Sequence, residues 1–446
     1  MKVAPITQEE AESTPSWYSM IAVMWSQTQN AFNDNLVKFV LVALATATVA
    51  HTWVGQNIEI VASSMIPLPF ILLAPVAGWM ADRFSKRSVM IGCVILQVAL
   101  LIWMAAVTLT VPADAGPALT ARHFHFAMAG FVLLSIQSTL YSPAKLGIAK
   151  ELVGSSRVGS VAGWMSMTSM VGILAGMILG GRLFAWMGER TGGDPWRATG
   201  ILMIVFAVAS LLPLAATCFV RRTPQQGARS FTPSIFVEHF GHLRILWRNR
   251  QLSRASVSLF LVWFVAYLLG MVTIAFGKEM HGAEEGASFI EASRATVAAA
   301  QMYVYIGVGL MAGSLLVALL SRKKIPVHLA PVGFLGVATG VALLGWFDPG
   351  TSLFTVGLLC AGFFSGFVMA PMGAFLQDES DPGERGRILS ANNLQISLGG
   401  IFAGAFLMLI RSFGFGNADQ MKMVVPIVLI GLFYSWLRLP QSRRAS

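Results

Sequence analysis

The amino-acid sequence predicts an all-α membrane protein in which twelve transmembrane helices form two pseudo-symmetric six-helix bundles. Composition is the first reason, because 55% of the 446 residues are hydrophobic and only 12% are charged, against about 25% charged residues in a typical soluble domain. The second reason is that apolar runs of about 20 residues, enough to cross a bilayer as a helix, recur along the whole chain. The third is a repeat that relates the two halves.

Twelve apolar segments are expected to cross the membrane. They are 19–50, 58–81, 89–111, 122–143, 158–187, 197–219, 254–277, 296–320, 328–347, 351–376, 388–411 and 420–437. The first is longer than a bilayer of about 30 Å requires at about 1.5 Å per helical residue, so it must tilt, kink or protrude.

These spans divide the chain into five parts. They are an N-terminal tail (1–18), a six-helix bundle (19–219), a linker (220–253), a second six-helix bundle (254–437) and a C-terminal tail (438–446). Most of the 31 Lys and Arg residues fall on the same side as both termini. Because cytoplasmic loops carry an excess of these residues, the tails and the linker are expected in the cytoplasm. The same bias accounts for the net charge of +10, so nucleic acid is not an expected partner.

The first span is unusually polar. Gln27, Asn30, Asp34 and Lys38 recur at intervals of three and four residues and would form one stripe on a helix, with Asn33 beside it. An ionised side chain near the bilayer centre costs about 2.5–3.5 kcal/mol on insertion scales, so Asp34 should face a polar cavity or a partner. In one interpretation Asp34 faces a cavity between the halves and binds substrate or a coupling ion, H⁺ or Na⁺. In the other, Asp34 and Lys38 form an intrahelical pair that only fixes packing.

The segment "GWMADRFSKRS", residues 78–88, connects the second and third spans. Its pattern G-x-x-x-D-R-x-x-K-R, beginning at Gly78, resembles the loop signature of the major facilitator superfamily. The resemblance implies that Asp82 meets the N-terminus of a helix in the other half and latches the cytoplasmic side, a contact worth about 0.3–1 kcal/mol. Arg83, Lys86 and Arg87 would hold Asp82 and meet lipid phosphates. A loop with only orientation charge and one unrelated acid is the alternative.

Glycine and proline positions repeat between the halves. Pro143 and Pro371, each expected to end a span, are separated by the same interval as Gly172 and Gly400 and as Gly176 and Gly404. Matched halves of six spans are typical of one large class of secondary transporter. Gly172, Gly176 and Gly180 on the fifth span, and Gly400 and Gly404 on the eleventh, also form stripes that allow close helix approach. They serve either ordinary tight packing or faces that slide when the halves rock.

The linker contains an amphipathic pattern. In "PSIFVEHFGHLRILWRNR", Phe236, Phe240, Leu243 and Trp247 recur at helical spacing beside basic residues. This pattern is typical of a helix that lies on the anionic inner leaflet. A linker helix with no role beyond packing is the alternative.

Three further segments resemble one branch of this superfamily more specifically. "AFNDNLVKFVLVALA" (31–45), "YSPAKLGIAKEL" (141–152) and "NNLQISLGG" (392–400) resemble the bacterial lysophospholipid transporter branch of the major facilitator superfamily. That branch moves lysophospholipids, chiefly lysophosphatidylethanolamine, from the outer to the inner leaflet for reacylation, and some relatives are fused to an acyltransferase. The resemblance therefore implies a bacterial inner-membrane protein with a lysophospholipid substrate, contacts to membrane lipids, and a separate acyltransferase as a partner.

Candidate substrate-binding residues lie in the first, fourth and eleventh spans. Asn30, Asn33 and Asp34 could meet an amine or a glycerol hydroxyl, and Lys38 or Lys145 a phosphate. Further candidates are Gln137, Tyr141, Asn392, Asn393 and Gln395. Alternatively, Asn392 and Asn393 cap the start of the eleventh span, and Lys145 supplies only orientation charge.

No enzymatic activity is expected. None of the seven histidines begins the H-x4-D pattern of acyltransferases, and the chain has no G-x4-GK[ST] phosphate loop. The three cysteines stand singly in apolar spans, which is not a metal or redox pattern. We therefore expect no catalytic residue, metal or cofactor.

Together these observations favour a secondary transporter that works by alternating access and holds a lysophospholipid headgroup in a central polar cavity. The alternative is an ion-coupled carrier of the same fold for a soluble solute, such as an organic cation, a drug or a siderophore. The two differ in whether the cavity opens laterally to lipid.

Overall fold

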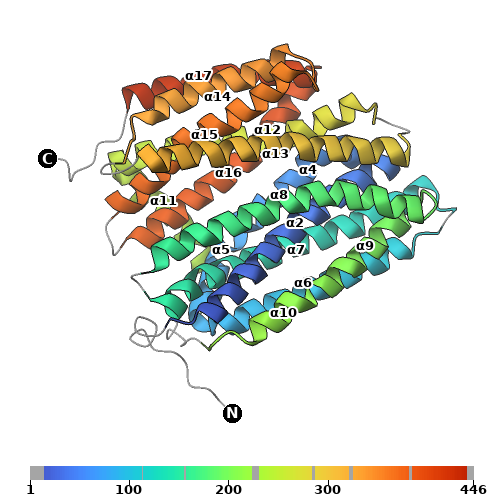
Figure 1. Cartoon of the computed structure of the whole chain (residues 1–446), viewed down its shortest axis with the longest axis horizontal. Helices are drawn as coiled ribbons and strands as arrows, with labels where there is room; N and C mark the ends of the chain where they lie inside the picture. Colours follow the sequence, from blue (N-terminus) through green and yellow to red (C-terminus); the bar gives the residue numbers. More distant parts are fainter. Residues whose placement is uncertain are drawn as a thin grey trace. The chain divides into compact units, whose positions relative to one another are not determined.

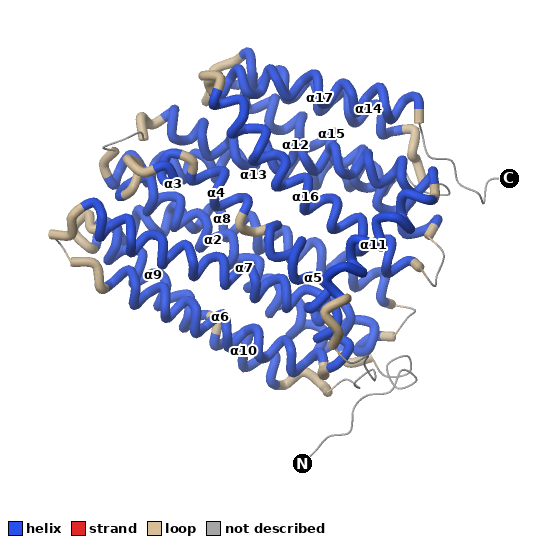
Figure 2. Tube along the Cα trace, turned by 180° about the vertical axis from the view of Figure 1, so that it is seen from behind, coloured by secondary structure: helices blue, strands red, loops and turns tan. Residues whose placement is uncertain are grey.

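The computed structural model describes residues 15–112, 114–154, 157–222, 231–283, 287–320, 325–380 and 384–438. Regular structure in these ranges is helical throughout, with no β-strand among them (Figures 1 and 2). Most of the predicted N-terminal tail (1–14), part of the linker (223–230) and nearly all of the C-terminal tail (439–446) lie outside the described residues.

The chain forms two compact units. The first comprises Met1–Ile58, Leu72–Phe236 and His281–Val297, and the second comprises Glu59–Ile71, Val237–Met280 and Ala298–Ser446. The main boundary falls inside the predicted linker. Two short segments, Glu59–Ile71 and His281–Val297, each group with the unit built mainly from the other half of the chain.

In the first unit, one long helix lies among the others. The helices that contribute most of this unit are α2 (Trp17–Thr48), α3 (Trp53–Gln56), α5 (Pro67–Arg83), α6 (Lys86–Leu109), α7 (Pro117–Val153), α8 (Val158–Arg190), α9 (Pro195–Ala209) and α10 (Leu211–Cys218). Helix α2 packs against α7, α8 and α9, while α6 packs between α7 and α9. Asp194 caps α9 by accepting the backbone N–H groups of Trp196 and Arg197, at 2.9 and 3.1 Å.

The second unit is arranged around α12. Its helices are α4 (Ile58–Ser64), α11 (Ile235–Arg248), α12 (Arg250–Met280), most of α13 (Phe289–Leu320), α14 (Leu329–Trp346), α15 (Ser352–Glu379), α16 (Arg385–Ser412) and α17 (Asn417–Leu437). Helix α12 packs against α15, α16 and α17, and α14 packs against α15 and α17. Its apolar core includes the fully buried rings of Phe276, Phe334 and Phe354.

Eleven helices among the described residues are long and apolar enough to cross a membrane. They correspond in order to the second through twelfth predicted spans, and α2 corresponds to the first. The polar residues between Gln27 and Lys38 lower the hydropathy of α2. Its 32 residues reach about 48 Å at about 1.5 Å each, longer than the hydrocarbon core of a bilayer.

The glycine stripe of α8 brings two helix backbones together, whereas the stripe of α16 faces side chains. A Cβ atom at Gly172, Gly176 or Gly180 of α8 would lie 2.4, 2.3 or 2.9 Å from a backbone carbonyl oxygen of α2. In the second unit, a Cβ atom at Gly404 of α16 would lie 2.9 Å from the Ser64 Oγ of α4. The stripe on α8 therefore faces α2 of its own unit at a distance that only glycine allows.

The prediction that Pro143 and Pro371 end their spans was wrong. Both prolines lie inside helices, because α7 continues to Val153 and α15 continues to Glu379. Tertiary packing supports these continuations, since Ala144, Ile148 and Leu152 beyond Pro143 are fully buried in the core of the first unit.

Candidate functional site

Asp34 lies at the centre of a hydrogen-bond network between α2 and α7. Its carboxylate Oδ2 accepts the Ser138 hydroxyl at 2.5 Å and the Asn30 side-chain amide at 3.2 Å. Asn30 also donates to Ser138 Oγ at 2.9 Å and accepts from Gln137 Nε2 at 3.1 Å. Of the predicted candidates, Asn30 therefore bonds to Asp34 directly and Gln137 joins the network through Asn30, while Ser138 bonds to both Asp34 and Asn30.

Lysine 145 adds a positive charge to this network. It stands seven residues after Ser138, which places both on the same face of α7. Its ammonium interacts electrostatically with the Asp34 carboxylate, and its Nζ lies 5.8 Å from the centroid of the Tyr141 ring. Tyr141 itself is fully buried and donates to Ser26 Oγ at 2.8 Å, so its hydroxyl is used within the unit.

The spacing predicted that the polar residues of α2 share one face that turns to a cavity. In the structure they bond to different neighbouring helices instead. Gln27 donates to the Met165 carbonyl of α8 at 2.7 Å, and Asn33 donates to Ser210 Oγ at 2.9 Å. Both side chains are 1% exposed, which leaves them no surface for a substrate. Successive polar residues instead tie α2 to different neighbouring helices, and Asp34 remains as the half-buried acid of the stripe.

Asp34 and Lys38 do not form the ion pair considered as an alternative. Among the ion pairs of the described residues, none joins these two side chains, and Lys38 is 6% exposed. The i and i+4 spacing permits the contact, but Asn30 and Ser138 occupy the carboxylate instead.

Ser210 forms a second polar centre in the first unit. It stands at the break between α9 and α10 and accepts from Gln29 Nε2 at 2.7 Å, from Asn33 Nδ2 at 2.9 Å and from Gln97 Nε2 at 3.2 Å. Its own hydroxyl donates to the Phe206 carbonyl at 2.7 Å. Sequence reasoning missed Ser210 and Ser138, because a lone serine in an apolar span carries no recognisable signal.

The candidates of α16 divide into buried and exposed residues. Asn392 accepts from Ser256 Oγ at 3.0 Å, and Gln395 accepts from Trp247 Nε1 at 3.0 Å, so both tie α16 to neighbouring helices. Asn393 is exposed. The capping alternative for Asn392 and Asn393 was wrong, because α16 begins at Arg385 with Glu384 at its N-cap.

Two basic residues at the start of α6, just after the loop that follows α5, bond to groups within the first unit. Lys86 forms a buried ion pair with Glu151 of α7, and Arg87 donates to the Cys218 carbonyl. The prediction that Lys86 holds Asp82 and meets lipid phosphates was therefore wrong, because this buried side chain pairs with Glu151 instead, while contact of Arg87 with lipid phosphates stays a prediction. Asp82 and Arg83 are exposed, and nothing among the described residues lies within 4 Å of a Cβ position at Gly78, so the latch stays a prediction.

The network around Asp34 has the groups needed to bind a polar ligand and lacks those of a metal centre. The described residues contain no group of three His, Cys, Asp or Glu side chains that could hold a metal ion. Gln137 Oε1 is buried and has no hydrogen-bond partner in the part of the chain that the structure describes. A carboxylate, an unused acceptor and an ammonium within one network can pair with a ligand that carries both charges.

The family model described as Major Facilitator Superfamily matches residues 21–404. The chain belongs to the major facilitator superfamily. Solved members share its fold: a bacterial homologue of the human lysosomal transporter Spinster has a TM-score of 0.67 at 16% identity, covering 95% of this chain and 96% of that one. The xylose transporter XylE from E. coli has a TM-score of 0.66 at 15% identity over 95% and 96% of the two chains. The predicted all-α major facilitator fold is confirmed.

Relatives of this superfamily member include lysophospholipid transporters. The protein named Lysophospholipid transporter LplT of Enterobacter sp. (strain 638) is 28% identical over 375 residues, 83% of each chain. The protein of the same name from Serratia proteamaculans (strain 568) is 26% identical over 365 residues, covering 81% of this chain and 80% of that one. These matches support the branch that the motifs of the sequence resemble.

Proposed function

We propose that this transporter moves lysophospholipids across the bacterial inner membrane by alternating access, with the headgroup bound at Asp34. The observation that carries the proposal is the Asp34 network itself. A carboxylate held by two neutral donors at 2.5 and 3.2 Å, with Lys145 in electrostatic range, stands inside a membrane helix bundle.

The charges of the network match those of a zwitterionic headgroup. Asp34 can accept hydrogen bonds from an ammonium, and Lys145 can donate to a phosphate. Asn30 and Ser138 hold the carboxylate in place before a ligand arrives, which reduces the entropy lost on binding. An acidic residue at membrane depth also indicates a substrate or ion pathway, since charge there is expensive.

The relatives point to the same class of substrate. Chains named lysophospholipid transporters match over four fifths of this sequence. The segment with Asn33, Asp34 and Lys38 and the segment with Tyr141 and Lys145 are among those that resemble this branch. A separate acyltransferase that consumes the lipid on the inner side is part of this proposal.

The competing candidate is a carrier for a soluble cation, with Asp34 bound to H⁺ or Na⁺. It rests on the same carboxylate, which can hold a proton or an ion as well as an amine. The two candidates differ in which substrate is taken up and in whether uptake depends on an ion gradient.

Reconstituted vesicles test the proposal. Uptake is measured for labelled lysophosphatidylethanolamine, labelled lysophosphatidylglycerol and a cationic dye, with and without proton and sodium gradients. We expect the lysophospholipids to move and the dye to stay outside. Movement of the dye alone, driven by an ion gradient, would establish the soluble-cation carrier instead.

An isosteric variant tests the role of the carboxylate. Asp34→Asn removes the charge that binds an ammonium, and charge-assisted hydrogen bonds are worth about 1.5–3 kcal/mol, so uptake should fall by roughly tenfold or more. Asp419→Asn, the same change at a half-exposed acid of α17, is the matched control and should keep wild-type uptake. Equal activity of Asp34→Asn and Asp419→Asn would remove Asp34 from the mechanism.

A further inference from the structure

The C-terminal half of α11 is attached to the second unit. Leu246 is fully buried in the apolar core of that unit, and Leu243 and Ile245 pack against the same core. Trp247 Nε1 donates to Gln395 Oε1 of α16 at 3.0 Å. These contacts fix the direction in which the remaining surface of α11 points.

The turn from α11 into α12 adds to this attachment. Helix α11 ends at Arg248 and α12 begins at Arg250, so a single residue, Asn249, joins them. Asn249 Oδ1 accepts from the backbone N–H groups of Gln251 and Leu252, at 3.0 and 3.3 Å, and thereby caps α12. A short, capped turn leaves α11 little freedom to rotate about its own axis.

The exposed face of α11 carries large apolar side chains. Val237, Phe240 and Trp247 are 72%, 48% and 59% exposed. Their spacing of three and seven residues places them within about 80° of one another around the helix. Large apolar side chains gathered on one exposed face indicate a surface that another molecule covers.

Two arginines lie along the same face. Arg244 and Arg248 are exposed and stand one helical turn apart. Arg244 also follows Phe240 by one turn, so basic and aromatic side chains are neighbours there. The 14 residues of α11 contain these two arginines and a single acid, Glu238. Aromatic rings beside arginines match the surface of an anionic membrane, where rings enter the headgroup region and guanidinium groups meet phosphates.

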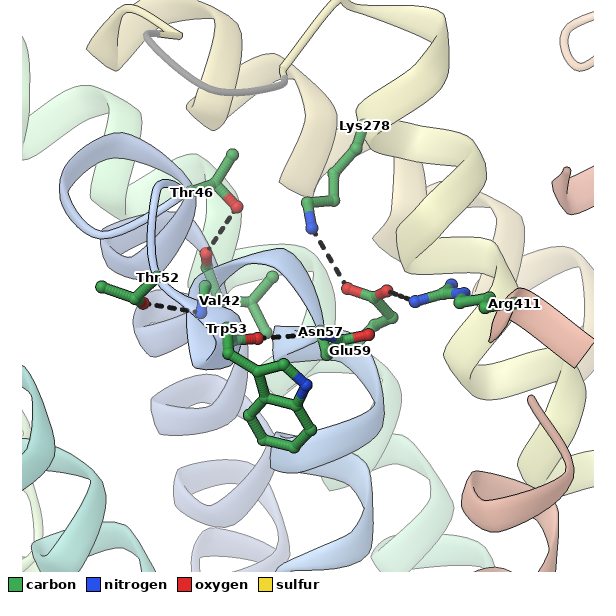
Figure 3. Close-up of polar contacts among 9 residues, drawn as sticks. Val42, Thr46, Thr52, Trp53, Asn57, Glu59, Lys278 and Arg411 are labelled. Atoms are coloured by element: carbon green, nitrogen blue, oxygen red, sulfur yellow. Dashed lines mark hydrogen bonds and ion pairs between the residues drawn. The ribbon is translucent and has the colours of Figure 1, made fainter. Parts of the chain in front are cut away.

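Other cations of the second unit have a carboxylate partner. Lys278, in the last turn of α12, pairs with Glu59 at 3.1 Å, and Arg411 pairs with the same carboxylate (Figure 3). Among the ion pairs of the described residues, none includes Arg244 or Arg248. Their charge is therefore available to an anion from outside the chain.

We infer that one face of α11 docks on a membrane surface and binds the phosphates of anionic phospholipids. This lipid-docking face consists of Val237, Phe240, Arg244, Trp247 and Arg248. The lipid is a surface partner and is not transported, so the inference goes beyond the proposed function and does not depend on it.

The position of α11 in the chain favours a membrane over a soluble acidic protein as the partner. Helix α12 is long and apolar enough to cross a membrane, and its predicted span begins at residue 254. The lipid-docking face therefore ends within about two helical turns of the hydrocarbon boundary. The indole of Trp247 has one polar bond, to Gln395, and an exposed ring, as is typical of tryptophan at a membrane–water interface.

Fluorescence quenching in lipid nanodiscs measures docking of the full-length chain. Val237→Cys carries a bimane label in a background in which Cys93, Cys218 and Cys360 are replaced by alanine. The discs contain phosphatidylcholine and a lipid with a nitroxide on its headgroup, with or without phosphatidylglycerol. Each disc is measured at about 0.1 M and about 1 M salt, between which the Debye length falls from about 10 Å to about 3 Å.

We expect phosphatidylglycerol to increase the quenching and high salt to reverse the increase, because salt screens the arginines from the phosphates. Each arginine near an anionic surface contributes about fivefold to binding, so Arg244→Gln/Arg248→Gln should lower the docking equilibrium constant by roughly thirtyfold. Arg244→Lys/Arg248→Lys keeps the charge and should keep the response to phosphatidylglycerol. Arg182→Gln/Arg197→Gln, the matched control, removes the same charge from two exposed arginines of the first unit and should leave the quenching unchanged.

Equal quenching with and without phosphatidylglycerol would overturn the inference, as would equal quenching in the two glutamine pairs. A lysine pair that responds as weakly as Arg244→Gln/Arg248→Gln would show that charge does not bind the lipid. Absence of quenching in every disc would show that this face lies away from the membrane, as a soluble partner would require. The lipid and salt comparisons need no arginine substitution, so they test the inference even if a variant does not fold. No lysophospholipid is present, so these outcomes are independent of the uptake assay.

Discussion

Replacement of Gly176 by alanine should weaken the contact on which the position of Asp34 depends. A Cβ atom at Gly176 would lie 2.3 Å from the Phe32 carbonyl oxygen and 3.1 Å from the Leu36 backbone nitrogen. Both obstacles are backbone atoms of α2, so no side chain can rotate away. Ordinary contact begins at 3.4 Å, and α2 and α8 must therefore separate by roughly 1 Å in a tightly packed interior.

Overpacking of this kind costs about 1–3 kcal/mol. Each kcal/mol lowers the unfolding midpoint of a domain of this size class by about 2–4 °C, so Gly176→Ala should melt several degrees below the wild type. Transport should fall as well, because Phe32 and Leu36 flank Asp34 and the 2.5 Å bond to Ser138 depends on the position of α2.

Thermal unfolding followed by size-exclusion chromatography in detergent measures the effect. Gly163→Ala is the matched control on the same helix, since nothing lies within 4 Å of its Cβ position. Alanine favours a helix over glycine by about 1 kcal/mol, so this control should be neutral or slightly stabilising. If the unfolding midpoint of Gly176→Ala equals or exceeds that of Gly163→Ala, the account of close α2–α8 packing is wrong.

Two further predictions concern single polar contacts. Ser138→Ala removes the 2.5 Å bond to Asp34 and should lower lysophosphatidylethanolamine uptake by about tenfold. Ser135→Ala, whose hydroxyl bonds to the Phe131 carbonyl of its own helix, should not lower it, and equal losses in both variants would show that the bond to Asp34 has no special role. Glu151→Gln leaves Lys86 buried without its acid and should destabilise the protein by about 3–5 kcal/mol, against about 0–1 kcal/mol for Asp419→Asn at a half-exposed pair. Thermal unfolding of both variants compares the two losses, and similar midpoints would contradict the burial argument.

The sequence by itself determined the fold class, the order of the spans and the family. Hydrocarbon accepts only segments that satisfy their own backbone, so apolar length predicts each span without knowledge of its neighbours. The loop motif around Asp82 and the segment around Asp34 are likewise local patterns. For the same reason the sequence marked Asp34 as exceptional, since a charge at membrane depth needs an explanation whatever surrounds it.

Only the tertiary structure decided which partner each polar side chain has. Residues three apart on a helix point about 60° apart, so Gln27, Asn30 and Asn33 drift around α2 and meet three different surroundings that no spacing rule identifies. Lys86 finds Glu151, and Glu59 finds Lys278 and Arg411, from positions far along the chain. Such pairs depend on how whole helices pack, and packing is set by many long-range contacts at once rather than by any local pattern.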